Sequence, residues 1–456
     1  MGCVGHEDIQ AWLDARSRDL GVVGCSLGIL EGDRQQIACA GLREVGSEAY
    51  VTPDTVFQIG SITKIFTTTQ IMQLVDAGRL LLDDPVSQYL PGFVLRHPAM
   101  SEVVTTRHLL NHTSGIDGDF FPEDPPTGDA LASYLENLGE QPAFAPVSRY
   151  MTYCNAGWVV LGRLIEVLTG VSWEQALQRD VLQPAGIANA FTRVEDAASF
   201  PCAIGHVFGE GESGPLRITP TPYLQRSLGP AGARLTMDVA SLLRFAKIHL
   251  RRGANEHGTQ VLSQVSCEAM QTGSVDLPPV SVRSNFDSWG LGWACRGCGE
   301  NRVIGHDGGT VGQYAYLRLM PGRDFALVLL TNSPSVPLWE AVEGELLPEL
   351  APPKRNRGVT PFLSSDMNLL VGVYENVAGT MTLTYSEGVA KLKVTSRLPG
   401  NEGDQSADVV RVRDGIYELR GTSGLEGEIC FLDSDEEGRA VYLRHGLRMA
   451  KRSEAW

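Results

Sequence analysis

The order of strand and helix patterns along this 456-residue chain predicts an α+β domain followed by a small β-barrel or β-sandwich. Apolar segments typical of β-strands occur near residue 30 and return between residues 303 and 330, with a long helical stretch between them. This order predicts an antiparallel sheet built from both ends of the domain, flanked by helices and joined by an all-helical subdomain. Only short strands are predicted in the last ninety or so residues.

The first strands lie on either side of a short polar turn. Residues 26–30 and 36–40 alternate or run apolar around Glu31-Gly32-Asp33, which predicts a β-hairpin. Two helices are predicted further along, because the spacing of their mostly apolar residues is helical and each pattern stops at a glycine, a common C-terminal cap. Their recurring residues are Ile62, Ile65, Phe66, Thr69, Met72 and Val75 before Gly78, and Trp158, Leu161, Leu164, Ile165 and Leu168 before Gly170.

Strand patterns return towards the end of the first domain, after a stretch from about 120 to 270 that is predicted as helix and loop. Residues 303–304, 314–320 and 325–330 are predicted strands, and the turn Pro321-Gly322-Arg323-Asp324 joins the last two. Antiparallel pairing with the N-terminal hairpin follows from this arrangement.

A domain boundary is predicted where residues 351–358 combine proline and charge without an apolar period. We therefore predict a first domain at residues 1–350, a linker at 351–362 and a β domain at 363–456. The strands predicted in the β domain are 381–385, 389–394, 416–419, 427–432 and 440–443.

Composition restricts the partners and the compartment. Hydrophobic residues make up 43% of the chain and charged residues 20%, which indicates an ordinary globular protein and not a disordered or fibrous one. The formal charge of −16 disfavours nucleic-acid and anionic-membrane partners, and no stretch approaches 18 uninterrupted apolar residues. Nine scattered cysteines, an odd number, fit a reducing compartment. We predict a cytoplasmic protein without a membrane span.

Ser61 and Lys64 form the first candidate for catalysis. Their i, i+3 spacing on a predicted helix places a hydroxyl and an amine on one face, where a deprotonated amine could take the serine proton. A Ser-x-x-Lys match occurs by chance about once in a chain of this length. By itself it equally fits a helix N-cap followed by a solvated lysine.

Two further motifs occur at informative positions. Tyr153-Cys154-Asn155 precedes a predicted helix, and His306-Asp307-Gly308-Gly309 follows a predicted strand. Taken singly, they fit an interfacial aromatic residue, a helix N-cap and a loop histidine. With Ser61 and Lys64, in this order, they resemble the three motifs of the serine β-lactamase and penicillin-binding protein superfamily. The resemblance is greatest to its class C-like branch of esterases, D-aminopeptidases and penicillin-binding-protein-type thioesterases.

The resemblance extends from about residue 8 to residue 335 and includes the segments Asn111-His112-Thr113-Ser114-Gly115-Ile116 and Trp289-Gly290-Leu291-Gly292-Trp293. It implies a β-lactamase/transpeptidase-like fold for the first domain. The C-terminal segment resembles the lipocalin-like β domain that some members append, a match that rests on composition.

The resemblance also implies roles for single residues. Ser61 is expected to be the nucleophile, Lys64 and Tyr153 the base pair, Asn155 a substrate-amide contact and His306 the group of the third motif. Lysine and tyrosine both have reference pKa values near 10, so each needs burial or the other's charge to act as a base at neutral pH.

Backbone N–H groups complete the expected site. Those of Ser61 and Gly309 are expected to bind the oxyanion, with Gly308 and Gly309 lining the substrate site because a missing side chain lets a carbonyl approach.

His306 marks a departure from β-lactamases, since it replaces the lysine of their third motif, and Asp307 replaces the hydroxyl residue. A permanently charged lysine binds the carboxylate of a β-lactam, whereas histidine is mostly neutral at pH 7 and can orient the base or bind a polar group. The charge of the neighbouring Asp307 further disfavours anionic substrates. We therefore expect peptide or ester acyl transfer and little β-lactam turnover.

Other motifs predict no metal and no cofactor. His108 and His112 are spaced i, i+4 without a third metal ligand, and Cys295 and Cys298 lie in a predicted loop without a second cysteine pair. Glycine-rich nucleotide motifs are absent from the sequence.

The sequence thus predicts two-step acyl transfer from a small-molecule or peptide acyl substrate, free or carrier-bound, to water or an amine. A penicillin-binding-protein-type thioesterase that releases or cyclises a peptide is one subgroup. D-aminopeptidase, carboxylesterase, β-lactamase and a non-catalytic penicillin- or peptide-binding protein are the alternatives.

Overall fold

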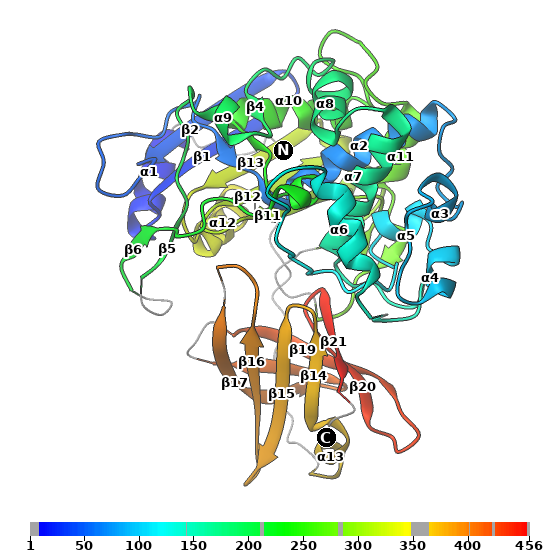
Figure 1. Ribbon diagram of the computed structural model, residues 1–456. Coiled ribbons are helices and arrows are strands. Elements are labelled where there is room, and N and C mark those ends of the chain that lie inside the picture. The colour runs from blue at the N-terminus through cyan, green and yellow to red at the C-terminus, as the bar shows by residue number, and fades with distance from the viewer. Residues whose placement is uncertain are drawn as a thin grey trace.

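The computed structural model shows an α+β domain and, on one side of it, a closed β-barrel, as the sequence predicts (Figure 1). The structure describes residues 9–142, 144–209, 214–280, 286–347, 364–400, 402–421 and 425–453. The predicted linker at 351–362 lies outside the described residues, so the proposed domain limits stay a prediction.

The first domain is built on an antiparallel sheet of eight strands within the described residues, in the order β2-β1-β13-β12-β11-β10-β9-β8. Both ends of the domain contribute, as predicted, because β1 pairs with β13 over its whole length. The strands are β1 (Gly24–Glu31), β2 (Arg34–Gly41), β8 (Val275–Asp276), β9 (Ser288–Trp289), β10 (Ala294–Arg296), β11 (Val303–Gly309), β12 (Tyr314–Met320) and β13 (Phe325–Thr331).

Both faces of this sheet are covered, which explains the continuous apolar sequence of β13. Ala326, Val328 and Leu330 belong to the core on one face, whereas Leu327 and Leu329 belong to a second core on the other. Helix α10 (Val239–Leu250) packs on the first face, and α1 (Ile9–Asp19) and α12 (Val336–Ala341) cover the second. A strand buried on both faces cannot alternate polar and apolar residues.

Helix α2 (Thr63–Asp76) is a buried helix of the first domain and starts two residues after the candidate nucleophile Ser61. Almost all of its length is buried, including three consecutive threonines that have no place in an apolar core unless they are hydrogen bonded. The Thr68 and Thr69 hydroxyls donate to carbonyls one turn earlier, and that of Thr67 donates to the Pro230 carbonyl at 2.9 Å. The Thr67 bond joins α2 to the segment around Pro230, whereas the Thr68 and Thr69 bonds lie within the helix.

The remaining helices gather beside the sheet as the predicted helical region. They are α2 (Thr63–Asp76), α3 (Val86–Tyr89), α4 (Pro98–Val103), α5 (Thr106–Leu110), α6 (Ala130–Gly139), α7 (Asn155–Thr169), α8 (Trp173–Leu177), α9 (Val194–Ala197) and α11 (Gln264–Gln271), with the turns η1 (Gly60–Ile62), η2 (Gln178–Leu182) and η4 (Arg226–Ala231). Gly78 and Gly170 follow α2 and α7 with positive φ, as expected of C-terminal caps.

Short strands also occur in the stretch that the sequence predicts as helix and loop. They are β3 (Phe57–Gln58), β4 (Ala190–Phe191), β5 (His206–Phe208), β6 (Leu216–Ile218) and β7 (Thr236–Met237), and all but β3 lie within residues 120–270. Two or three residues are too few to show a strand period, so the sequence could not indicate them.

The C-terminal unit is a closed barrel, which decides between the barrel and the sandwich. Helix α13 (Ser364–Leu370) precedes the strands β14 (Gly372–Asn376), β15 (Gly379–Ser386), β16 (Val389–Ser396), β17 (Gly403–Arg413), β18 (Ile416–Arg420), β19 (Gly427–Ser434), β20 (Ala440–His445) and β21 (Arg448–Arg452). The sequence did not predict β14, β17 and β21. Strand β17 begins with Gly403 and two acidic residues among its first six, and its outward face is polar.

The barrel contacts the first domain at several described points. Arg149 forms an ion pair with Asp433 at 2.6 Å, and the Tyr442 hydroxyl donates to the Phe144 carbonyl at 3.3 Å. The Tyr153 N–H donates to the carbonyl of Leu447, between β20 and β21, at 2.8 Å. The turn between these two strands therefore reaches a predicted site residue.

No single helix in the described part of the chain is long and apolar enough to cross a membrane; α7 and the helical segment from Trp173 to Leu182 pass that test only as a pair bent by 77°.

Candidate active site

Ser61 lies in η1, where three segments of backbone meet at glycines. A Cβ atom on Gly60 would lie 2.3 Å from the Gly309 nitrogen, and one on Gly232 or Gly308 would lie 2.8 or 3.0 Å from the Ser61 nitrogen. Gly60 also has φ 52, in the left-handed region. Only glycine lets these segments approach so closely, and the N–H groups expected to bind an oxyanion are thereby brought together.

Lys64 is the second residue of α2, one turn after Ser61, and is fully buried. Its Nζ is 3.0 Å from Ser61 Oγ, 2.7 Å from Asn155 Oδ1 and 2.5 Å from the Ala231 carbonyl oxygen. Burial holds the pKa of the amine well below its usual value, the charge of Arg448 lowers it further, and Asp119 opposes the shift. Compared with an exposed lysine, the buried amine is thus shifted towards its neutral form.

The three contacts of Lys64 define what the neutral amine can do. Asn155 Oδ1 and the Ala231 carbonyl can only accept hydrogen bonds, so they take the two N–H groups. The remaining lone pair is then directed at the third partner, the Ser61 hydroxyl. This geometry suits proton transfer from Ser61 to Lys64.

Tyr153 lies beside both residues with a buried ring. Lys64 Nζ is 5.0 Å from the ring centre, and His112 stacks on the ring with centroids 4.4 Å apart. Burial raises the pKa of the Tyr153 phenol above its usual value, while a hydrogen bond with Ser61 and the charge of Arg448 oppose the rise. Tyr153 is therefore a neutral phenol that can donate a proton, and Lys64 is the better base of the predicted pair.

Asn155 is the first residue of α7, and Cys154 is the N-cap, so Asn155 is not the helix cap. Both polar atoms of its side chain are used within the protein. Oδ1 accepts from Lys64, and Nδ2 donates to Asp119 Oδ1 at 2.7 Å. The amide thus fixes the position of the Lys64 amine, in addition to the substrate contact expected from the resemblance.

Sequence reasoning did not find Asp119 and Arg448. Asp119 is 6% exposed and forms an ion pair with Arg448, whose Nη2 lies 3.3 Å from Asp119 Oδ1. Arg448 is the first residue of β21, and its guanidinium lies 5.1 Å from the ring centre of Tyr153. Neither residue belongs to a motif, and their separation by 329 positions leaves no local signal.

His306 lies within β11, because this strand continues to Gly309 and not only to the predicted residue 304. The imidazole is 4% exposed, and Nδ1 lies 2.6 Å from the Asp307 carbonyl oxygen. Burial lowers the pKa of His306 to about 3. The neutral ring expected from the sequence follows, and its Nε2 has no hydrogen-bond partner among the described residues.

Asp307 forms an ion pair away from His306, and the two glycines that follow it differ in how closely other backbone approaches them. Neighbouring strand residues face opposite sides of the sheet, and the Asp307 carboxylate pairs with Arg318 at 2.5 Å. Its charge is therefore balanced and does not repel an anionic substrate as the sequence suggested. Gly308 is required by the Ser61 turn, whereas a Cβ on Gly309 would have room.

The two histidines with i, i+4 spacing have hydrogen-bond partners within the protein. His108 Nδ1 accepts from the Thr105 N–H, and its Nε2 lies 2.7 Å from Ser148 Oγ. His112 is buried and accepts from the Cys154 N–H at 2.9 Å. Within the described ranges, no three His, Cys, Asp or Glu side chains are grouped as a metal site would need.

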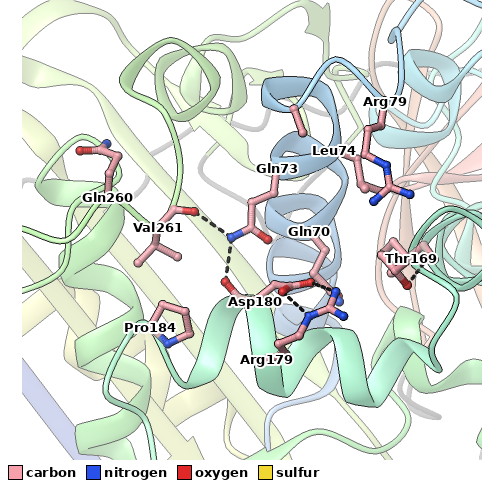
Figure 2. A pocket seen from close by; sticks show the side chains of 12 residues that line it. Gln70, Gln73, Leu74, Arg79, Thr169, Arg179, Asp180, Pro184, Gln260 and Val261 are labelled. Atoms are coloured by element: carbon pink, nitrogen blue, oxygen red, sulfur yellow. Dashed lines mark hydrogen bonds and ion pairs between the residues drawn. The ribbon is translucent and has the colours of Figure 1, made fainter.

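A polar pocket of about 390 Å³ lies along the second half of α2, away from Ser61 (Figure 2). Gln73 points into it and donates to the backbone carbonyls of Asp180 and Val261, and Arg179 pairs with Asp180. Its lining, drawn from the described residues, contains no serine, cysteine, lysine or histidine. The pocket therefore lacks a serine–lysine pair like the one at the start of α2.

Comparisons with known proteins show the family of this chain. A family model described as Beta-lactamase matches residues 9–342. Penicillin-binding protein 4 of Amycolatopsis lactamdurans is 36% identical over 388 residues, which cover 82% of this chain and 98% of that protein.

One similar solved structure covers nearly the whole chain, and another covers about the length of the first domain. The crystal structure of SurE has a TM-score of 0.78 at 27% identity, covering 97% of this chain and 98% of SurE. The D-amino acid amidase from Ochrobactrum anthropi SV3 shares the fold of the first domain at 22% identity, with a TM-score of 0.60 over 72% of this chain and 90% of the amidase. The resemblance read from the motifs is confirmed: the chain belongs to the β-lactamase family of serine hydrolases.

Proposed function

We propose that the protein is a serine acyltransferase or hydrolase that forms an acyl-enzyme at Ser61. The observation that carries this proposal is the Lys64 amine, which is buried, shifted towards its neutral form and 3.0 Å from Ser61 Oγ. A lysine that served only structure would be expected at the surface or opposite a carboxylate.

In the first step, Lys64 takes the Ser61 proton while Ser61 Oγ attacks the substrate carbonyl carbon. The N–H groups of Ser61 and Gly309 stabilise the resulting oxyanion. Collapse of the tetrahedral intermediate then breaks the bond to the leaving group. The Tyr153 phenol, hydrogen bonded with Ser61, donates the proton that the leaving group needs, and the Lys64 ammonium ion replaces that proton.

In the second step, water or an amine attacks the acyl-enzyme and the proton movements reverse. Water gives hydrolysis, and an amine at the other end of the same peptide gives a ring. His306, with a neutral imidazole and an unpaired Nε2 among the described residues, can accept a hydrogen bond from Tyr153 or from a substrate N–H.

As substrate we propose a peptide acyl group whose reacting residue has the D configuration, offered as a thioester, ester or amide. Two relatives support this choice: SurE, whose structure has been solved with D-Leu, and the amidase named for D-amino acids. A relative named as a hydrolase of unguisins, from Aspergillus violaceofuscus, is 24% identical over 68% of this chain and 58% of its own length, which supports hydrolysis as one outcome of the reaction.

Penicillin binding is the second candidate, because a penicillin-binding protein is 36% identical over nearly its full length. Against rapid β-lactam turnover stands His306, a neutral group where β-lactamases have a charged lysine. We expect slow acylation by benzylpenicillin at most and little turnover of nitrocefin.

The test is intact-mass spectrometry after treatment with a fluorophosphonate probe. Wild-type protein should gain one adduct that the S61A variant does not, and absence of an adduct on the wild type would refute the acyl-enzyme. Matched pairs of peptidyl thioesters that differ only in D or L configuration at the reacting residue then test the substrate. Equal rates for both members of a pair would reject the stereochemical part of the proposal.

A further inference from the structure

The turn between β20 and β21 brings a charged residue of the barrel to the active site of the first domain. The Leu447 carbonyl accepts from the Tyr153 N–H at 2.8 Å, and the next residue, Arg448, places its guanidinium beside the Tyr153 ring. Both contacts are made to the residue that flanks Ser61 and Lys64. The catalytic centre therefore includes atoms of the barrel.

Arg448 is connected to Lys64 through two further side chains. Its guanidinium pairs with Asp119; the Asp119 Oδ1 accepts from Asn155 Nδ2 at 2.7 Å; and the Asn155 Oδ1 accepts from Lys64 Nζ at 2.7 Å. Each link is a hydrogen bond or an ion pair. A change at Arg448 is thereby transmitted to the amine that faces Ser61.

The charges of Asp119 and Arg448 both act on the Lys64 amine. The Asp119 carboxylate is buried close to Lys64, and an unpaired negative charge there would favour a positive lysine. Arg448 compensates Asp119 and adds its own positive charge near the amine. We propose that Arg448 is a positioning residue of the active site, which acts through Asp119 and Asn155 to hold Lys64 beside Ser61 and keep its amine uncharged.

Other titratable groups near Lys64 leave this balance unchanged at neutral pH. Burial lowers the pKa of His112 and His306, so both rings are neutral, and it raises the pKa of the Cys154 thiol to about 12. Tyr153 is a neutral phenol. Asp117 is the exception, because burial raises its pKa to about 7, and the D117N background removes its titration from the experiment.

The inference rests on the proposed role of Lys64 as base, and its test needs no natural substrate. The rate of Ser61 modification by a small fluorophosphonate is measured by intact mass across pH 5–10, in wild type and in R448M, and again with D117N added to both. The acidic limb of the profile is the pH range in which the labelling rate rises as Lys64 loses its proton. Because loss of the guanidinium raises the pKa of Lys64, this limb should move to higher pH by about one unit. The rate at pH 7 should fall about tenfold and recover at alkaline pH.

Three further variants separate this effect from docking of the barrel. R448K keeps the charge and should keep the position of the limb. R448M/D119N removes both charges and should return the limb towards that of the wild type. R149M breaks the 2.6 Å ion pair with Asp433 between the same two units, distant from Ser61, and should keep the wild-type profile.

The possible failures are distinguishable. A wild-type limb in R448M, or an equal fall at all pH values in both R448M and R149M, would overturn the inference and leave the acyl-enzyme intact. If R448M does not fold, R448K and D119N carry the test, since loss of the Asp119 charge should move the limb to lower pH and an unmoved limb in D119N would overturn the inference. Absence of labelling in the wild type would overturn both proposals.

Discussion

The two ends of α2 are both rich in polar groups, but they use them differently. At the start of the helix, Lys64 Nζ meets two pure acceptors and the Ser61 hydroxyl, which leaves a lone pair directed at that hydroxyl. At the other end, the Gln73 amide donates to two backbone carbonyls beside an open pocket (Figure 2). The reactive end of the helix is therefore distinguished by an amine whose partners leave its lone pair available. The volume of a pocket does not distinguish it.

The largest expected effect follows from removal of the amine. Lys64→Met keeps the length of the side chain but removes the base, so the rate of Ser61 labelling by the fluorophosphonate should fall between about 10²- and 10⁴-fold. The free energy of unfolding, measured with urea, checks that the fold is kept. A labelling rate within a few-fold of the wild type would contradict the role of Lys64 as base.

Alanine at the two glycines of this region gives a second contrast. A Cβ on Gly60 would lie 2.3 Å from the Gly309 nitrogen, whereas one on Gly78, after the helix, has nothing within 4 Å. Both glycines have positive φ, so both substitutions should lower the free energy of unfolding by about 1–2 kcal/mol.

Only Gly60→Ala should also displace β11 from the Ser61 turn. A shift of about 1 Å at a reacting group reduces rates by about 10²-fold, and the labelling rate measures this loss. Gly78→Ala serves as the matched control with a normal rate. Equal rates in the two variants would show that the close approach of β11 is not needed.

These contrasts also show which parts of the molecule the sequence could predict. Helices α2 and α7 and the strands β12 and β13 carry a local period and were placed correctly, whereas Ser61, expected on the helix, lies in the turn η1 just before it. Gly232 and Ala231 O reach Ser61 and Lys64 from η4, and Asp119 and Arg448 reach Asn155 and Tyr153 from a loop and from the barrel. Such residues become neighbours only in the folded chain, so no spacing in the sequence indicates them.

Acid should reduce stability through two buried histidines, one near Ser61 and one on the far side of α2. Burial lowers the pKa of both His306 and His249 to about 3, against about 6.5 when unfolded. Between these values the unfolded chain binds more protons, so this stability is complete above pH 6.5 and is lost as the pH falls.

Each histidine should contribute a loss of about 1.4 kcal/mol per pH unit below 6.5. Urea unfolding at a series of pH values measures the slope, and His249→Gln should reduce it by one histidine's share. The slope is the readout, because the substitution also changes stability at all pH values. An unchanged slope in the variant would mean that His249 binds its proton in the folded state.

The smallest effect is expected at the pocket end of α2. Gln73→Ala removes the hydrogen bonds to the Asp180 and Val261 carbonyls, 2.8 and 2.7 Å long, and should lower the free energy of unfolding by about 1–3 kcal/mol. The rate of Ser61 labelling should stay at the wild-type value, since Lys64 keeps all three partners. A parallel fall in rate would show that the hydrogen bonds at the pocket control the position of α2, and the two ends of the helix would then act as one site.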